Sequence, residues 1–295
     1  MGLASGTILK SNQAEYTIVK EIARGGMGAI YQAEDRQSDR AVAIKEACLD
    51  PVACAENIDQ IRERLIHEMQ VLMPLNHPNI PRIYDQFSGE NNAYLVMELI
   101  EGQTLMLIQR WVLAQNSLIE ESRVLGWAVQ ILDALAYLHS QSKPIIHRDI
   151  KPDNLILSAD GRVMLVDFGL MKQIERQAKS GPLVHAFGTV EFAPPEQYAD
   201  GAGTDQRTDL YSLGATMYFM LSGKLPPKAV DRMLPTSINI SLKLPSLRKI
   251  NSTVSRHTER VISKAMEIDP EQRYRSAREM REALCPRRSF IPLPF

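Results

Sequence analysis

The chain has 295 residues, which is long for one hydrophobic core and typical of two lobes or domains. Apolar residues make up 44% and charged residues 23%, a composition that excludes wholesale disorder. The 34 basic and 35 acidic side chains give a net charge of -1, so the chain has no overall electrostatic signature for nucleic acid or an anionic membrane. We therefore expect no nucleic-acid partner.

The cysteine and hydropathy patterns indicate a cytoplasmic protein. Cys48, Cys54 and Cys285 are too few for a disulfide framework and favour a reducing compartment. No run of about 18 uninterrupted apolar residues occurs, so we expect no membrane span in this chain.

The first third of the chain has a β-rich pattern. Residues 1–15 are small and polar, and we expect a flexible lead-in there. Short apolar runs separated by polar turn residues then predict strands at 16–19, 30–33, 41–44, 80–87 and 93–99. Over residues 57–75 apolar side chains recur at steps of three and four, which predicts one helix.

The pattern beyond Gly102 is mainly helical. Apolar stripes predict helices at 122–140, 208–221 and 257–266. The proline-containing tail, 285–295, is expected to be irregular. The chain therefore predicts an α+β fold of two lobes: a small β-rich lobe with one main helix at 16–100 and a larger helical lobe at 101–284. A cleft between two lobes is a favoured place for a small ligand.

Two clusters in the predicted small lobe suit phosphate binding. Glycines 25, 26 and 28 lie between two predicted strands, where backbone N–H groups could approach phosphate oxygens. A tight hairpin would explain these glycines alone equally well. Lys45 ends the apolar run Val-Ala-Ile-Lys and is costly to bury without a partner. Glu68 on the predicted helix offers a partner, and a surface lysine at a strand end is the alternative.

Two clusters in the second half of the chain suit acid–base and metal chemistry. Residues 147–154, His-Arg-Asp-Ile-Lys-Pro-Asp-Asn, combine acids, bases and an amide in one short segment. The run Leu-Val-Asp-Phe-Gly follows at 165–169. Asn154 and Asp167 are hard oxygen donors of the kind that magnesium binds together with phosphates and water. Each cluster alone could be a polar turn, but all four in this order are not expected by chance.

With these clusters the chain resembles the eukaryotic-like (Hanks-type) serine/threonine protein kinases of bacteria over residues 16–284. The resemblance implies a two-lobed protein-kinase-like fold. It also implies ATP- and Mg²⁺-dependent transfer of the γ-phosphate to Ser/Thr hydroxyls of proteins, including autophosphorylation, in bacterial signalling. Mn²⁺ is an expected substitute for Mg²⁺, and a kinase-domain dimer is an assembly that the family allows.

The family's residue roles carry over position by position. Asp149 is implied as the catalytic base, Lys151 as a γ-phosphate contact, and Asn154 with Asp167 as metal ligands. Lys45, paired with Glu68, is implied to hold the α- and β-phosphates. The nucleotide-binding set is implied to be Ile22, Ala23, Arg24, Gly25, Gly26, Met27, Gly28, Ile30, Ala43, Lys45, Glu68, Met97, Glu98, Ile100, Ile156 and Asp167.

The resemblance extends to the segment before residue 197 and to a distant arginine. Residues 188–196 match the end of the activation segment, 208–214 match the helix that anchors the catalytic loop, and Arg273 matches the partner of Glu196. Ala23 departs from the family by standing where the first glycine of the loop usually stands, which could restrict the approach of that loop to nucleotide.

The activation segment, residues 169–196, contains two hydroxyl side chains, Ser180 and Thr189. Thr189 matches a family residue that contacts Asp149 and Lys151, which leaves Ser180 as the candidate phosphorylation site. Arg148 keeps the capacity to bind a phosphate there. We expect weak dependence on phosphorylation of this segment.

Two other function classes are weighed against an active protein kinase. A pseudokinase acting as a nucleotide sensor or scaffold would lack Lys45, Asp149 or Asp167, and all three are present. A small-molecule phosphotransferase of related architecture would lack the peptide-docking segment at 189–196, which is also present.

Overall fold

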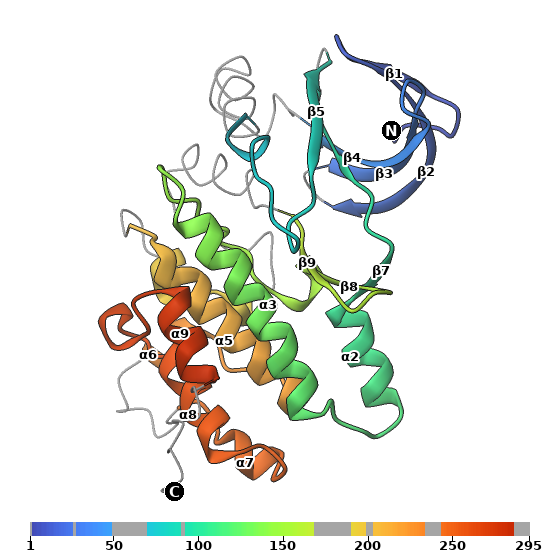
Figure 1. The fold of residues 1–295 in the computed structure, drawn as a ribbon. Helices are drawn as coiled ribbons and strands as arrows, with labels where there is room; N and C mark the ends of the chain where they lie inside the picture. The colour runs from blue at the N-terminus through green and yellow to red at the C-terminus, as the bar shows by residue number, and fades with distance from the viewer. Residues whose placement is uncertain are drawn as a thin grey trace, which may run out of the picture. The chain divides into compact units, whose positions relative to one another are not determined.

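The computed structural model describes most of the chain and divides it into two compact units. The described residues are 2–25, 28–48, 70–89, 92–167, 190–198, 203–233 and 243–285. Unit 1 comprises Met1–Gly102, Ser158–Asp160 and Met164–Gly188, and unit 2 comprises Gln103–Leu157, Gly161–Val163 and Thr189–Phe295. Figure 1 shows the strands and helices of both units. Most of the helix predicted at 57–75 lies outside the described residues, and residues 70–72 are helical.

Unit 1 is built on a six-stranded antiparallel sheet in the order β1-β2-β3-β4-β6-β5. Its strands are β1 (Ile8–Lys10), β2 (Glu15–Gly25), β3 (Gly28–Asp35), β4 (Arg40–Cys48), β5 (Ile83–Ser88) and β6 (Asn92–Glu98). All five strands predicted from the alternating runs are therefore present. The observed strands are mostly longer, because antiparallel pairing continues into the polar residues that flank each run.

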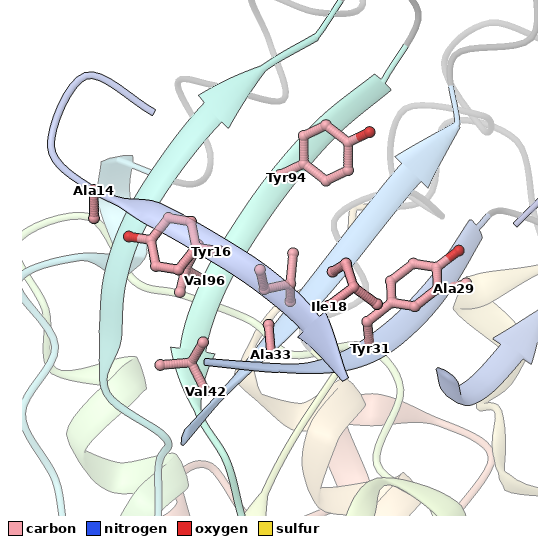
Figure 2. Packing of buried hydrophobic residues seen from close by; sticks show 10 residues of the cluster. Ala14, Tyr16, Ile18, Ala29, Tyr31, Ala33, Val42, Tyr94 and Val96 are labelled. Carbon is pink, nitrogen blue, oxygen red and sulfur yellow. The ribbon is translucent and has the colours of Figure 1, made fainter. Parts of the chain in front are cut away.

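Strand alternation gives this sheet two different faces. Tyr31, Ile44 and Val96 lie opposite one another on β3, β4 and β6, and all three are fully buried in one hydrophobic cluster. Figure 2 shows the side chains of that cluster. The neighbouring row, Ile30, Lys45 and Leu95, is also in register. Because successive side chains point to opposite faces, Lys45 belongs to the other face of the sheet.

The N-terminal segment differs from the flexible lead-in that we expected. Strand β1 pairs with β2, and Ala14 is buried within the hydrophobic cluster. Leu3 packs against the same cluster, and its backbone N–H donates a hydrogen bond to the Tyr31 hydroxyl at 3.0 Å. The segment is ordered by contacts with residues distant in the sequence, which a local pattern does not reveal.

Unit 2 is mainly helical. Its described helices are α2 (Leu105–Ala114), α3 (Glu121–His139), α5 (Gln206–Ser222), α6 (Ala229–Met233), α7 (Leu247–Ile250), α8 (Arg256–Ala265) and α9 (Ala277–Leu284). Every residue of α5 from Thr208 onward is buried, and α5 packs against α3 and α8. The three predicted helices correspond to α3, α5 and α8 within two residues, whereas the sequence pattern did not predict α2, α6, α7 and α9. None of the helices described is both long and apolar enough to cross a membrane.

Short elements carry the segments of chemical interest. Strands β7 (Gly102–Thr104), β8 (Leu155–Ser158) and β9 (Val163–Leu165) form a three-stranded sheet in that order. The described single-turn 3₁₀ helices are η1 (Pro152–Asn154), η2 (Val190–Phe192), η3 (Pro195–Gln197) and η4 (Pro270–Gln272).

Candidate active site

Unit 1 brings together Lys45 and Asp167, which are 122 residues apart in the sequence. The Lys45 ammonium on β4 contacts the Asp167 carboxylate, which follows β9. The Leu165 N–H donates to the Asn79 carbonyl at 2.8 Å and so ties β9 to the chain before β5. The two charged side chains are 22% and 37% exposed, so water still reaches the pair. Lys45 thus has a carboxylate partner, and its predicted partner Glu68 lies outside the described residues.

The glycine-rich turn joins β2 to β3. Gly28 has a φ of +147°, and a Cβ added there would lie 1.9 Å from the Glu46 carbonyl oxygen. Any side chain at this position would collide with the backbone of β4, so the turn requires glycine here. Ala23 pairs with Ile30 in the ladder and does not have a positive φ, so alanine fits this part of the strand. Gly26 and Met27 lie outside the described residues.

Several apolar residues of the predicted nucleotide site share the Lys45 face. Ala43 and Met97 are paired across β4 and β6, two positions from the Lys45–Leu95 pair. Ile30 pairs with Lys45 on β3. The sheet therefore places the three predicted side chains Ile30, Ala43 and Met97 on the face that carries the ammonium group.

The remaining residues of the predicted nucleotide site come from several different elements of the two units. Ile22 is 49% exposed on β2. The Glu98 N–H donates to the Arg82 carbonyl at 2.8 Å, which directs this N–H toward the chain before β5. Ile100 follows β6, and Ile156 lies on β8 within unit 2.

The Arg24 side chain lies on the face opposite Lys45. Arg24 pairs with Ala29, and its guanidinium donates to the Glu21 carboxylate at 3.0 Å and to the Tyr31 hydroxyl at 3.2 Å. Its hydrogen bond with Glu21 raises the pKa of Arg24 and lowers that of Glu21. Any contact of Arg24 with nucleotide would therefore use its backbone.

Unit 2 brings together the three predicted residues of the catalytic loop. The Lys151 ammonium lies 3.1 Å from Asp149 Oδ2. Asn154 Nδ2 donates both to that carboxylate oxygen and to the Asp149 carbonyl, each at 2.8 Å. The Asp149 and Lys151 side chains are only 11% and 14% exposed. The arrangement holds an ionised carboxylate in one orientation beside a cation.

A fully buried aspartate on α5 anchors the start of this loop. Asp209 accepts hydrogen bonds from the His147 N–H at 3.0 Å and the Arg148 N–H at 2.8 Å. His139 Nε2 lies 2.8 Å from the same carboxylate and carries the hydrogen, because an ionised carboxylate only accepts. The predicted role of residues 208–214 as the anchor of the loop is consistent with these bonds.

A buried ion pair fixes the segment that precedes α5. Arg273 donates to both oxygens of Glu196, at 2.7 and 2.9 Å, and the arginine side chain is fully buried. Thr208 adds a hydrogen bond to Glu196 at 3.0 Å. The Arg273 guanidinium also lies over the Tyr211 ring, 4.9 Å from its centroid, and burial raises the pKa of Tyr211. The predicted pairing of Arg273 with Glu196 is confirmed.

Two residues at the site were not predicted. Gln197 Nε2 donates to the Arg148 carbonyl at 2.9 Å, and Thr204 Oγ1 accepts from Arg148 Nε at 2.8 Å. Each is a single polar residue without a repeating pattern. The sequence carries no signal that would connect either of them to Arg148.

Comparison with known proteins identifies the family. The sequence model of the protein kinase domain matches residues 16–284. The chain is 33% identical over 266 residues to the probable serine/threonine-protein kinase PknB of Lactococcus lactis. It is 32% identical over 274 residues to the serine/threonine-protein kinase PrkC of Bacillus subtilis. The chain therefore belongs to the protein kinase domain family.

Solved structures support the same fold. The kinase domain of Mycobacterium tuberculosis PknI is similar with a TM-score of 0.71 at 25% identity, over 96% of this chain and 98% of that chain. The apo form of PpkA-294 gives a TM-score of 0.76 at 24% identity, over 96% and 99% of the two chains. The predicted α+β protein-kinase fold is confirmed. The alignments with PknB and PrkC cover 90% and 92% of this chain but only 40% of each relative, so the chain spans about two fifths of their length.

Proposed function

We propose that this chain is an ATP- and Mg²⁺-dependent protein kinase that phosphorylates Ser and Thr hydroxyls of proteins, itself included, in bacterial signalling. The observation that carries the proposal is the Asp149 carboxylate, held by Lys151 and Asn154 in a loop anchored on a buried aspartate. A carboxylate fixed in this way can orient a substrate hydroxyl and accept its proton.

The chemistry of these residues, taken in each unit by itself, suits a divalent cation and phosphate oxygens. Asn154 makes both of its hydrogen bonds to Asp149 through Nδ2, so its Oδ1 is turned away from Asp149. This oxygen could serve as a ligand of the cation. Asp167 supplies a carboxylate of the kind that Mg²⁺ prefers. The bound cation would neutralise phosphate oxygens during transfer. Lys45 would exchange its contact with Asp167 for phosphate oxygens, and Lys151 would lie beside the transferred group.

The proposal includes several finer points. Mn²⁺ is expected to substitute for Mg²⁺, and the three cysteines favour the cytoplasm as the location of this domain. The relatives PknB and PrkC bear the name serine/threonine-protein kinase, which favours protein substrates over small molecules. The motif Asp149-x-Lys151 favours Ser/Thr over Tyr as the acceptor, through the resemblance noted above.

The test is transfer of radiolabelled phosphate from ATP to the chain itself and to a generic basic protein. Asp149→Asn should lower the rate by about 10²- to 10⁴-fold, because it removes the proton acceptor. Asp153→Asn is a matched control, since it makes the same change at an exposed position in the same loop and should leave the rate near that of the unaltered chain. Chelation of divalent cations should abolish transfer, and acid hydrolysis should release phosphoserine or phosphothreonine.

The outcomes separate the alternatives. Transfer by the unaltered chain no faster than by Asp149→Asn would contradict the proposal and favour a scaffold. Label that reaches small hydroxyl compounds but no protein would favour a small-molecule phosphotransferase.

A further inference from the structure

Arg148, the residue before the proposed base, is held at three separate points. Its N–H donates to Asp209 Oδ1 at 2.8 Å, and its carbonyl accepts from Gln197 Nε2 at 2.9 Å. Its side-chain Nε donates to Thr204 Oγ1 at 2.8 Å. The backbone of one residue is therefore fixed on both sides, by partners that come from α5 and from η3.

The backbone conformation of Arg148 needs such support. Its φ is +64°, in the left-handed region that side chains with a Cβ disfavour. A residue keeps such a conformation when the surrounding structure determines it, and these conformations gather at functional sites. The hydrogen bonds to Asp209 and Gln197 supply this support, one on each side of the Arg148 Cα.

The Gln197 hydrogen bond acts on the peptide group that leads into Asp149. The Arg148 carbonyl belongs to the planar unit that also contains the Asp149 nitrogen, so fixing the oxygen fixes the plane from which the Asp149 side chain projects. Gln197 is 8% exposed, which shields its amide from competing water. Its own position is set by the adjacent Glu196, which pairs with buried Arg273.

We propose that Gln197 is a positioning residue for Asp149 that acts through the Arg148 carbonyl, with Thr204 as a second support through the Arg148 side chain. This inference rests on the proposed function for the role of Asp149. It assigns to the residue after Glu196 a direct part in the geometry of the catalytic loop. Loss of the amide should let the peptide group between Arg148 and Asp149 rotate, so that the carboxylate is misaligned although the fold persists.

The chain offers a matched control for the loss of this amide. Gln109 is also buried, and its Nε2 donates to a backbone carbonyl, that of Phe219, at 3.2 Å. Phe219 lies on α5, ten residues beyond the aspartate that anchors the loop. Gln197→Met and Gln109→Met therefore remove the same type of hydrogen bond from the same unit. Only the hydrogen bond of Gln197 adjoins Asp149.

The experiment measures phosphate transfer and amide hydrogen exchange for both variants. Gln197→Met should lower kcat by about 10- to 100-fold, as expected for a misplaced reacting group, and leave the KM for ATP within about twofold. Exchange of the amides at 147–149 should accelerate by about tenfold as the loop opens more often. Gln109→Met should change neither kcat nor exchange at 147–149, whatever it does to the melting temperature.

Two variants of Thr204 test the second support. Thr204→Val removes the hydroxyl and should lower kcat several-fold, whereas Thr204→Ser keeps the hydroxyl and should restore the rate. If Thr204 had only a structural role, Thr204→Val and Thr204→Ser variants of equal melting temperature would have the same kcat.

The results decide the inference separately from the proposed function. Unchanged kcat and unchanged exchange at 147–149 in Gln197→Met would overturn the inference, and so would an equal loss of kcat in Gln109→Met. If the unaltered chain shows no Asp149-dependent transfer, the proposed function fails. Hydrogen exchange then still decides whether Gln197 fixes the loop.

Discussion

The charged groups of the candidate site are held differently in the two units. In unit 1 the Lys45–Asp167 pair is partly open to water, with side chains 22% and 37% exposed. In unit 2 Asp149 and Lys151 are 11% and 14% exposed, and the supporting Asp209 is fully buried. The proposed base in unit 2 is thus built into a buried hydrogen-bond network, whereas the proposed phosphate-binding lysine in unit 1 belongs to a charge pair that is partly hydrated.

This difference follows from the tasks that we propose for these two residues. A base must keep one orientation through the reaction, and preorganised groups avoid reorganisation at that moment. A phosphate-binding lysine must instead give up one partner for another, and a hydrated ion pair is weak enough to be exchanged. The comparison predicts that substitutions in the buried network of unit 2 lower stability together with activity, while substitution of Lys45 in unit 1 lowers activity with little change in stability.

The largest effect on stability is expected for Asp209→Asn. The amide NH2 group would replace either Oδ2, which faces the His147 N–H and the His139 ring, or Oδ1, which faces the Arg148 N–H. In either orientation at least one backbone N–H of the loop would lose its acceptor. We expect a loss of about 3 kcal/mol in the free energy of unfolding, because hydrogen bonds to a buried charged group are broken. Denaturant unfolding of the purified chain measures this change.

The control for Asp209→Asn is an aspartate in the same unit whose ion pair is exposed. Asp133 lies 2.6 Å from Arg281, and both side chains are 44% exposed. Asp133→Asn should cost about 1 kcal/mol or less. Equal losses for the two variants would contradict the view that the buried network is what holds the catalytic loop.

Lys45→Met tests the expected difference between the two units by a substitution in unit 1. Removal of the ammonium should lower phosphate transfer by about 100-fold, since one preorganised positive group is lost from the phosphates. The free energy of unfolding should fall by no more than about 1 kcal/mol, because the pair with Asp167 is partly hydrated. Transfer kinetics and denaturant unfolding of the same preparation give both numbers.

Lys20 supplies the control for Lys45→Met. It is an exposed lysine on β2 of the same sheet, and Lys20→Met should leave transfer unchanged. A destabilisation by Lys45→Met as large as that by Asp209→Asn would remove the distinction between the two units.

The parts of this architecture that the sequence predicts are those set by local periodicity. Alternation at Tyr16 and Ile18 identifies β2, and a sustained apolar stripe identifies α3. The face occupied by Glu21 does not follow from that alternation, because irregularities in the β2–β3 pairing shift the register between residues 18 and 20 and between 21 and 23, and Glu21 pairs with the cluster residue Tyr31. Alternation counted along the sequence alone does not locate these shifts.

The supports of the catalytic loop depend on contacts between distant residues. Gln197 and Thr204 are 49 and 56 residues from Arg148 in the sequence. Neither belongs to a periodic pattern, and a polar residue after Glu196 is equally suited to a solvated turn. Family resemblance assigned the pairing of Glu196 with Arg273, but the physical role of the next residue required the folded arrangement.

The smallest effect is expected for Ser180→Ala in the activation segment. Ser180 lies outside the described residues, and its proposed role comes from the sequence. In the structure the Arg148 guanidinium already donates to Thr204 at 2.8 Å, and the Arg148 backbone is held by Asp209 and Gln197. Because the chain itself supplies these supports, the loop should not need a phosphate to order it. Transfer should therefore stay within about twofold of that of the unaltered chain.

Phosphatase treatment of the unaltered chain provides the companion measurement for Ser180→Ala. It should also leave the initial rate of transfer to an added protein within about twofold. Loss of transfer in Ser180→Ala, with the fold retained by circular dichroism, would mean that the supports from Gln197 and Thr204 do not suffice. A phosphate on the activation segment would then be required to bring Arg148 and Asp149 into place.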